Sequence, residues 1–138
     1  MNRLEYWIKA QTQYRVHSPF VFDMYRKVLF AHLPHSIAQR LATEHGDQCR
    51  RYREMVYKLQ DHYHLRTVCY DMDEAVLEGD PDTFGTLKVV SRPHGSRLRE
   101  LRWQAQCGNT KYNVSIDLFD VGLLLSHPKL AKQHFLLK

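Results

Sequence analysis

Residues 112–126 read YNVSIDLFDVGLLLS, and this stretch predicts the sheet around which the rest of the chain is arranged. Apolar and polar side chains alternate from residue 112 to residue 119, which is the pattern of a strand with one buried face. Residues 121–126 form a second, more apolar β-prone run. Asp120 and Gly122 lie near the corner between the two runs, and both residue types favour turns. We therefore expect two strands here.

Two shorter β-prone runs and a basic helix precede this stretch. Residues 67–71 and 86–90 are predicted strands, and the turn-forming residues of 79–85 predict a loop between them. Ser96 is a good N-cap for a basic helix over residues 97–107, because its hydroxyl can accept a bond from a free backbone N–H. The second half of the chain is therefore predicted to form a small mixed sheet of about four strands with one helix.

The best-marked helix start lies near the N-terminus, where His17-Ser18-Pro19 precedes the apolar run FVFDMYRKVLF. The Ser18 side chain can cap a helix. Pro19 then falls at the first helical position, where its missing N–H costs nothing. The pattern predicts a helix from about residue 19 to residue 31.

Further helices are predicted on either side of it. A short amphipathic helix is expected at the start of the chain, where apolar residues have helical spacing at Leu4, Trp7 and Ile8. Ser36 and Gln39 have the spacing of a capping box, which predicts a third helix that stops near Gly46. Asp47 is the expected cap of a fourth helix, which runs to about His64.

Length and composition fit one folded domain. The chain has 138 residues, 43% of them hydrophobic, so we expect a single domain over residues 1–138, helical in 1–65 and an α/β half-sheet in 66–138. No apolar run approaches the roughly 20 residues that a membrane span needs, and the N-terminus lacks the pattern of a signal peptide. Three widely spaced cysteines suit reduced thiols. These features predict a cytoplasmic protein that does not enter a membrane.

Charge is unevenly distributed along the chain. The formal net charge is +5, yet six of the 15 acidic residues lie in residues 71–82, which contain no base. The remainder of the chain is therefore strongly basic. Such a surface could attract phosphates or acidic partners, but it is more typical of solvated helix faces.

Both ends of the chain resemble one protein family. The N-terminal HSPFVFDMYRKVL is similar to the first helix, and YNVSIDLFDVGLLLSHPKLAKQHFLLK to the C-terminal β-hairpin and tail, of a class I S-adenosylmethionine-dependent methyltransferase family of Bacteroidetes-type bacteria. The resemblance covers residues 5–30 and 86–138. It implies that the chain retains the C-terminal half of the methyltransferase sheet. With residues 67–71 as the family's fourth strand, the implied strand order is 67–71, 86–90, 121–126, 112–119; descent of residues 67–71 from the first strand is the alternative.

The cofactor-binding part of that family has no counterpart here. Its members carry a strand followed by a Gly-rich turn that lets the backbone approach S-adenosylmethionine, and no pair of this chain's glycines has that spacing after a strand. After the family's fifth strand comes a DDIHW-like stretch, whereas this chain has SRPHG, in which only His94 matches. The resemblance therefore makes S-adenosylmethionine conceivable as a ligand, but no residue is assigned to bind it.

Few residues qualify as site candidates. His17 and His94 are candidates for polar groups in a cleft. Arg97, Arg99 and Arg102 with Trp103 combine cations and an aromatic ring, which can bind RNA phosphates and stack on bases. No histidine joins cysteines or acids at the spacing of a zinc site, and no serine or cysteine nucleophile motif is present. We assign no catalytic residue and no metal ligand.

Three functions are consistent with these patterns. The first is a methyltransferase-derived, catalytically silent module for binding or assembly. The second is an S-adenosylmethionine-dependent methyltransferase whose site is completed by a partner chain or a dimer mate. The third is an RNA-binding protein. A homodimer is expected, with another protein as a possible partner. Strand 67–71, as the fourth strand, has lost its inner neighbour and would expose an unpaired edge to a second copy or to that copy's N-terminal helices.

Overall fold

The chain is an α/β protein in which helices cover both faces of a mixed six-stranded sheet. The computed structural model describes residues 1–11, 17–44 and 49–138. The helices are α1 (Arg3–Lys9), α2 (Pro19–Met24), the π-helix η2 (Tyr25–Leu29), α3 (His35–Thr43), α4 (Arg50–Tyr63) and α5 (Arg97–Cys107). The strands are β1 (Arg66–Tyr70), β2 (Glu74–Glu78), β3 (Thr86–Ser91), β4 (Val114–Asp117), β5 (Val121–Ser126) and β6 (Gln133–Leu136).

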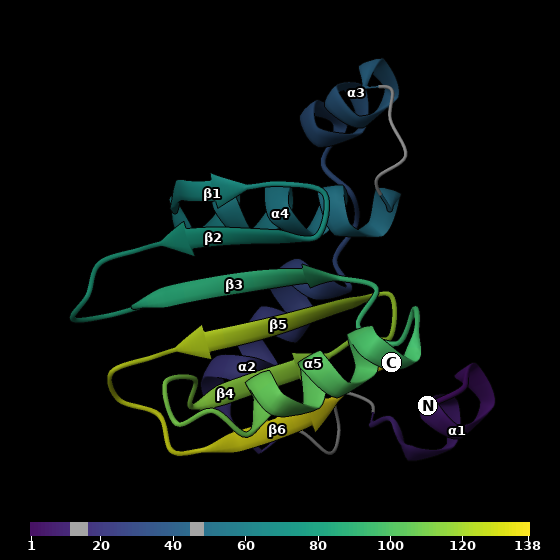
Figure 1. Cartoon of the computed structure of the whole chain (residues 1–138). Helices are drawn as coiled ribbons and strands as arrows, with labels where there is room; N and C mark the ends of the chain where they lie inside the picture. Colours follow the sequence, from purple (N-terminus) through teal and green to yellow (C-terminus); the bar gives the residue numbers. More distant parts are fainter. Residues whose placement is uncertain (12–16, 45–48) are drawn as a thin grey trace.

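The sheet confirms the α/β class, but the expected number of about four strands is wrong. Its order is β1-β2-β3-β5-β4-β6, antiparallel throughout except for the parallel pair β4–β6. The predicted strands follow one another in the implied order, with β2 inserted between β1 and β3 and β6 added beyond β4 (Figure 1). β1 is an edge strand, as expected. Its register shifts between Thr67 and Cys69, so Val68 forms a bulge.

The N-terminal helices begin largely where their caps predict. The Ser18 hydroxyl accepts a bond from the Val21 N–H at 3.4 Å, and Pro19 opens α2. The helix then widens into η2, which the sequence did not indicate. The capping role expected of Ser36 is wrong, because α3 begins at His35 after Pro34 and has no side-chain cap.

The fourth helix ends close to the residue that the sequence predicts. α4 stops at Tyr63, and His64 follows in the left-handed conformation, with φ 54°. Gly46 and Asp47, the predicted end of the third helix and cap of the fourth, lie outside the described residues.

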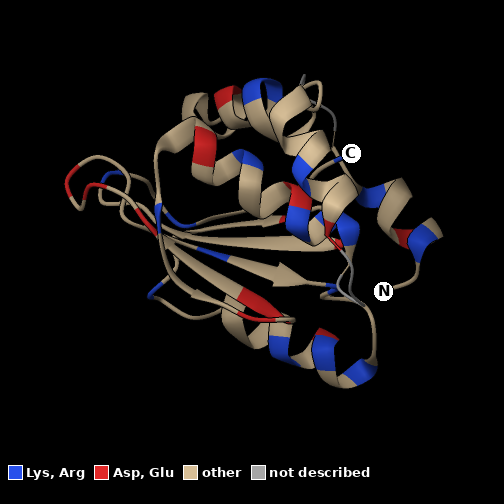
Figure 2. Ribbon diagram, turned by 90° about the horizontal axis from the view of Figure 1, so that it is seen from above, with Lys and Arg blue, Asp and Glu red and all other residues tan. Residues whose placement is uncertain are grey.

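Helices lie on both faces of the sheet (Figure 2), and a hydrophobic cluster lies beneath the helices on each face. The larger cluster joins α2, η2, α3 and α4 to one face, and Tyr52, Met55 and Leu59 of α4 are fully buried in it. The smaller cluster lies under α5, where Trp103 packs over Gly122. A side chain at position 122 would overlap the Trp103 ring, so this glycine sets how closely α5 approaches the sheet.

The two ends of the described chain are joined. Gln11 forms a parallel bridge with Leu137, and the Lys138 Nζ donates to the Trp7 carbonyl oxygen at 2.7 Å. The Tyr25 hydroxyl donates to the Lys138 carbonyl oxygen at 2.5 Å. α1 is thereby held beside β6. Within residues 1–11, 17–44 and 49–138, no helix has the length and apolar character to cross a bilayer.

Candidate functional site

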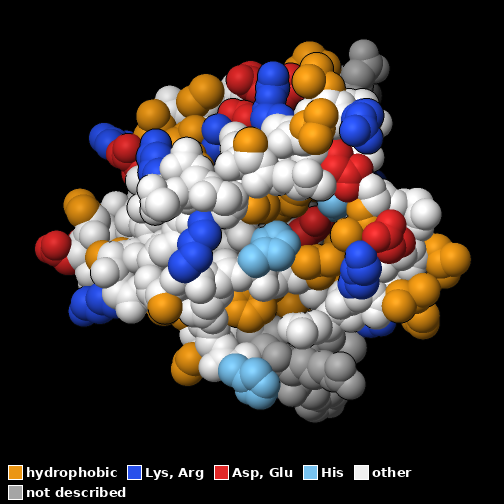
Figure 3. Space-filling view, turned by 60° about the horizontal axis from the view of Figure 1, so that its bottom comes forward, with side chains coloured by type: hydrophobic (Ala, Val, Ile, Leu, Met, Phe, Trp, Pro, Cys, Tyr) orange, Lys and Arg blue, Asp and Glu red, His pale blue; other side chains and the backbone are white. Residues whose placement is uncertain are grey.

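A hollow of about 280 Å³ lies beside α5, over the end of the sheet formed by β4 and β6. Histidine, acidic and hydrophobic side chains gather in a hollow of this face (Figure 3). The residues that line it are Met1, His94, Glu100, Trp103, Gln104, Cys107, Asp117, His134 and Leu136. The combination of imidazoles, carboxylates and a thiol makes this hollow the candidate site.

His94 is the centre of the polar network in this hollow. Its Nε2 donates to Asp117 Oδ2 at 2.6 Å, and its Nδ1 donates to Glu100 Oε1 at 3.1 Å. The His94 and Asp117 side chains are only 4% and 3% exposed. The other oxygen of Asp117 accepts the Phe119 N–H at 2.8 Å, and the Phe119 ring stacks on the imidazole with centroids 5.2 Å apart. The imidazole is therefore held on three sides.

These contacts favour the protonated imidazole. Burial alone lowers the pKa of His94, but the hydrogen bond and the charge of Asp117, followed by those of Glu100, outweigh burial and raise the pKa above its usual 6.5. An imidazolium between two carboxylates is an ion-pair cluster. The raised pKa disfavours a role as general base, because a base must be unprotonated near neutral pH.

The raised pKa of His94 predicts a pH dependence of stability. A raised pKa in the folded state gives stability that is fully present below the unfolded value of 6.5 and is lost as the pH rises through the folded value. We expect His94→Gln to lower the free energy of unfolding more at about pH 6 than at about pH 9, measured by urea titration. Equal losses at both pH values would contradict this assignment. Comparing each pH with the unchanged protein cancels the titration of other groups.

A second pair of polar side chains lies next to this network. Ser115 Oγ and His134 Nδ1, on the neighbouring strands β4 and β6, are 2.6 Å apart. Burial is the main cause that lowers the pKa of His134, so its ring is neutral at pH 7. Burial also raises the pKa of the Cys107 thiol to about 11. Because the thiolate is the nucleophilic form of cysteine, Cys107 is inert here.

The network fixes α1 on the body of the protein. The Tyr6 hydroxyl lies 2.7 Å from the Asp117 carbonyl oxygen and also contacts that of Leu137. Its ring packs edge-on against Phe119, with centroids 5.2 Å apart. Arg3 pairs with Asp120 at 3.0 Å. The polar side chains of the hollow thus pair with one another, and these contacts help to hold α1 and α5 in place.

The predicted site residues do not form one cluster. His94 and Trp103 line the hollow, but Trp103 is 3% exposed and has no free face for a base. Arg99 pairs with Asp73 Oδ1 at 2.6 Å and donates to the Ser91 carbonyl oxygen at 3.0 Å. Arg97 and Arg102 are exposed on α5. His17 is exposed just before α2 and does not line the hollow.

Sequence reasoning missed Asp117, Glu100 and His134. A signal for Asp117 was present, because the alternation of residues 112–119 puts Ser115 and Asp117 on the same face of one strand. Two polar residues on one face of an otherwise apolar strand indicate a polar network. Glu100 and His134 carried no such signal, since only the packing of α5 and β6 brings them to this strand.

Neither a metal nor a known family is indicated for this site. Over the described parts of the chain, no group of three or more histidine, cysteine or acidic side chains could hold a metal ion. Comparison of the sequence and the structure with models of protein families, with curated proteins and with solved structures found no match.

Proposed function

We propose that the chain is a methyltransferase-derived module for assembly, and that it forms a homodimer through a surface made by α1 and α5. The observed order of β3, β5 and β4 supports this descent, because it is the order that the resemblance implies for the end of a methyltransferase sheet. The polar groups of the hollow, which pair with one another, support a role without catalysis.

The observation that carries the proposal is a set of exposed apolar side chains, which we call the α1–α5 face. Its members are between 50% and 70% exposed and are Leu4, Trp7 and Ile8 of α1 and Leu98 and Leu101 of α5. At 100° per residue, Leu4 and Ile8 lie on the side of α1 opposite the buried Tyr6, and Trp7 lies on the flank between them and Tyr6. Leu98 and Leu101 lie on the side of α5 opposite the buried Trp103. Both helices therefore turn apolar stripes outward, which is typical of an interaction surface.

The charges between the two stripes fit a second copy of the chain. A groove of about 460 Å³ runs between α1 and α5, and its charged lining includes Glu5, Lys9, Arg97 and Glu100. Glu5 already pairs with Lys9 at 2.8 Å and Glu100 with His94, so the groove carries little unbalanced charge that would repel a second copy across a twofold axis. A face that is apolar and balanced in charge is self-complementary.

The edge of β1 is a poorer surface for dimerisation than the sequence suggested. Its first four residues are exposed, as predicted for an unpaired edge. The bulge at Val68 interrupts the regular spacing of N–H and C=O groups that pairing with another strand needs. We therefore move the proposed interface from residues 67–71 to the α1–α5 face.

The other two functions have less support in the structure. RNA binding by base stacking has little support, because Trp103, the aromatic ring expected to stack on bases, is buried. A methyltransferase would need glycines that let the backbone approach S-adenosylmethionine. Here Gly85, with φ +88°, forms a turn, and Gly122 makes room for Trp103, so both serve the packing of the chain itself. S-adenosylmethionine titrated by calorimetry tests the enzyme hypothesis directly. Micromolar binding of this cofactor would contradict a silent module.

Substitutions on the α1–α5 face are expected to abolish the dimer. Ile8→Glu and Leu101→Glu each place a charge in the proposed apolar contact, while both side chains are exposed in the single chain and their loss leaves the fold intact. Light scattering at micromolar concentration should give a dimer for the unchanged protein and a monomer for both variants.

Two control variants separate this interface from others. Met72→Glu changes an equally exposed apolar residue outside the face and should leave the dimer unchanged. Val68→Lys changes an exposed residue of the edge strand β1 and should likewise leave the dimer unchanged. A monomeric Val68→Lys protein with a dimeric Leu101→Glu protein would return the interface to β1. A monomeric unchanged protein would contradict the proposal altogether.

A further inference from the structure

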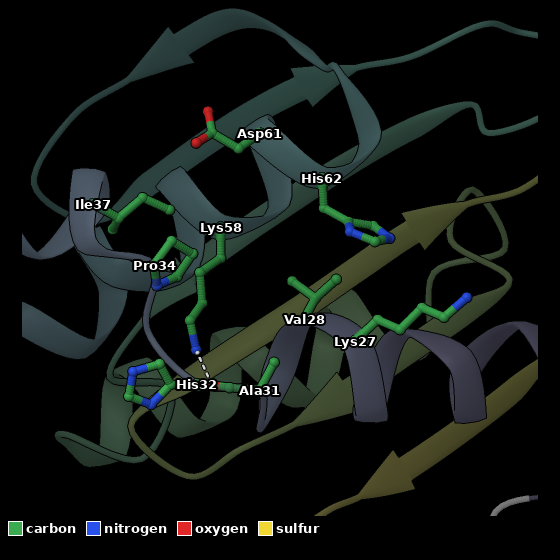
Figure 4. A pocket seen from close by; sticks show the side chains of 9 residues that line it. All are labelled: Lys27, Val28, Ala31, His32, Pro34, Ile37, Lys58, Asp61 and His62. Atoms are coloured by element: carbon green, nitrogen blue, oxygen red, sulfur yellow. Dashed lines mark hydrogen bonds between the residues drawn. The ribbon is translucent and has the colours of Figure 1, made fainter.

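A second cavity lies among the N-terminal helices, away from the α1–α5 face. It has a volume of about 190 Å³ and is bounded by η2, the segment that follows it, α3 and α4 (Figure 4). The residues that line it are Lys27, Val28, Ala31, His32, Pro34, Ile37, Lys58, Asp61 and His62. It is smaller than the roughly 300–1,000 Å³ of pockets for drug-sized ligands, so it suits a small molecule.

Lys58 supplies a buried positive charge to this cavity. Its side chain is 5% exposed, and its Nζ donates to the Ala31 carbonyl oxygen at 3.0 Å and pairs with Glu54 Oε1 at 3.2 Å. An ammonium group has three N–H donors. Among the described residues these two oxygens are its hydrogen-bonding and ionic partners, so one donor remains for a ligand in the cavity.

The other polar side chains are arranged to favour an anion. The His32 ring lies on the same side of the cavity as the Lys58 ammonium, whereas the Asp61 carboxylate points away from both (Figure 4). Lys27 stands at the rim, paired with Asp23 at 3.0 Å. The cavity therefore contains a donor from Lys58 and a ring nitrogen from His32; Glu54, the carboxylate paired with Lys58, is not among the residues that line it.

The remaining wall is apolar. Val28, Ala31, Pro34 and Ile37 line it with aliphatic surface. An anion that fills this cavity must accordingly carry a small hydrocarbon body as well as a charged group, because apolar surface is best covered by apolar surface. A fully polar anion such as inorganic phosphate would leave this wall without an apolar group to cover it.

The helix that forms one wall has an unusual backbone. η2 is a π-helix over Tyr25–Leu29, closed by the bond from the Phe30 N–H to the Tyr25 carbonyl oxygen at 3.1 Å. π-helical turns are rare and occur frequently at functional sites. Here the widened turn carries Lys27 and Val28, which both line the cavity.

We propose that this cavity binds a small organic monocarboxylate, with its carboxylate on Lys58 and His32 and its hydrocarbon body on the apolar wall. A single carboxylate fits because the site offers it two donors: the third N–H of Lys58, left free by Glu54 and the Ala31 carbonyl oxygen, and a ring N–H of His32. This site is independent of the α1–α5 face, and its ligand is defined by charge and size.

Titration of the ¹⁵N-labelled protein with sodium butyrate and sodium benzoate, followed by NMR, tests the proposal. At least one of the two should shift the amide signals of Val28 and Ile37 to saturation. Lys58→Met keeps the length of the side chain and removes its charge, and His32→Leu changes an exposed residue without disturbing the core. We expect Lys58→Met to weaken binding at least tenfold and His32→Leu to weaken it severalfold.

Matched controls keep the outcome decisive. His35→Leu replaces an exposed histidine of α3 that does not line the cavity, and it should bind as tightly as the unchanged protein. Butylamine and inorganic phosphate should not saturate the same signals. Absence of carboxylate binding, binding that is unaffected by both Lys58→Met and His32→Leu, or tighter binding of phosphate than of either carboxylate would overturn the proposal. His32→Leu decides the test if Lys58→Met fails to fold.

Discussion

Replacement of Gly85 by alanine is expected to lower the free energy of unfolding by about 4 kcal/mol or more, because two costs add at this position. Gly85 has φ +88°, a conformation that side chains other than hydrogen rarely adopt. A Cβ there would also overlap the Ser126 carbonyl oxygen on the neighbouring strand. The backbone of β3 or β5 must therefore shift. Urea titration followed by circular dichroism measures the loss.

Gly108→Ala is the matched control for Gly85→Ala. Gly108 caps α5 at φ −78°, and a Cβ there would meet its nearest backbone atoms at an ordinary 3.6 Å. Alanine should therefore be neutral, or stabilise the protein by up to about 1 kcal/mol by restricting the unfolded chain. A Gly85→Ala protein as stable as the Gly108→Ala protein would show that the loop between β2 and β3 can adopt another conformation.

Replacement of Asp117 by asparagine is expected to cost about 3 kcal/mol. The change removes the negative charge that lies 2.6 Å from His94 Nε2, while a side-chain oxygen remains to accept the Phe119 N–H. The buried imidazolium then keeps only Glu100 as a counter-ion. Its pKa should fall, and the stability that His94 contributes below its usual pKa should fall with it.

Asp120→Asn is the control for the loss of a carboxylate in this region. Asp120 pairs with Arg3 at 3.0 Å, but both side chains are well exposed. Exposed pairs of this kind contribute about 1 kcal/mol or less. A smaller loss for Asp117→Asn than for Asp120→Asn would mean that the buried pair does not stabilise the fold. NMR titration of the His94 signal in both variants separates an effect on its pKa from a general loss of structure.

The parts of the fold that the sequence predicted have strong local patterns. Ser18-Pro19 and Ser96 both form their expected N-caps, because the capping bond is made within three residues of the cap. The alternation of residues 112–119 marked β4, and the apolar run of 121–126 marked β5. The relative order of the predicted strands β1, β3, β5 and β4 came from the resemblance to a family. Local hydrogen bonding and periodicity need no knowledge of the remote chain.

The missed strands lack such patterns. β2 lies in the most acidic segment of the chain, and its residues Glu74, Val76 and Glu78 are only half-buried, on the face of the sheet that carries α5. Its strand conformation depends on pairing with β1 and β3. β6 is short and depends likewise on its parallel partner β4. In both cases tertiary contacts outweigh intrinsic propensity.

The candidate site was predictable only in part, for a related reason. His94 was identified from its place in the chain, but its partners come from α5 and β4, and no spacing links these to it. The outward position of Leu4, Trp7 and Ile8 was equally hidden. An amphipathic pattern shows that a helix has an apolar side, whereas only the docking of Tyr6 shows that this side faces solvent.

The bridge between Gln11 and Leu137 has a consequence for the order in which the protein is built. A ribosome completes α1 long before it reaches β6, and the carbonyl of Leu137 that contacts Tyr6 is added near the end of the described chain. Contacts between residues so far apart in the sequence close late in folding, because a long loop must be ordered first. The α1–α5 face is therefore absent from a growing chain. If copies pair through this face, as we propose, they do so only after synthesis has passed residue 137, and neighbouring nascent chains are then protected from premature association.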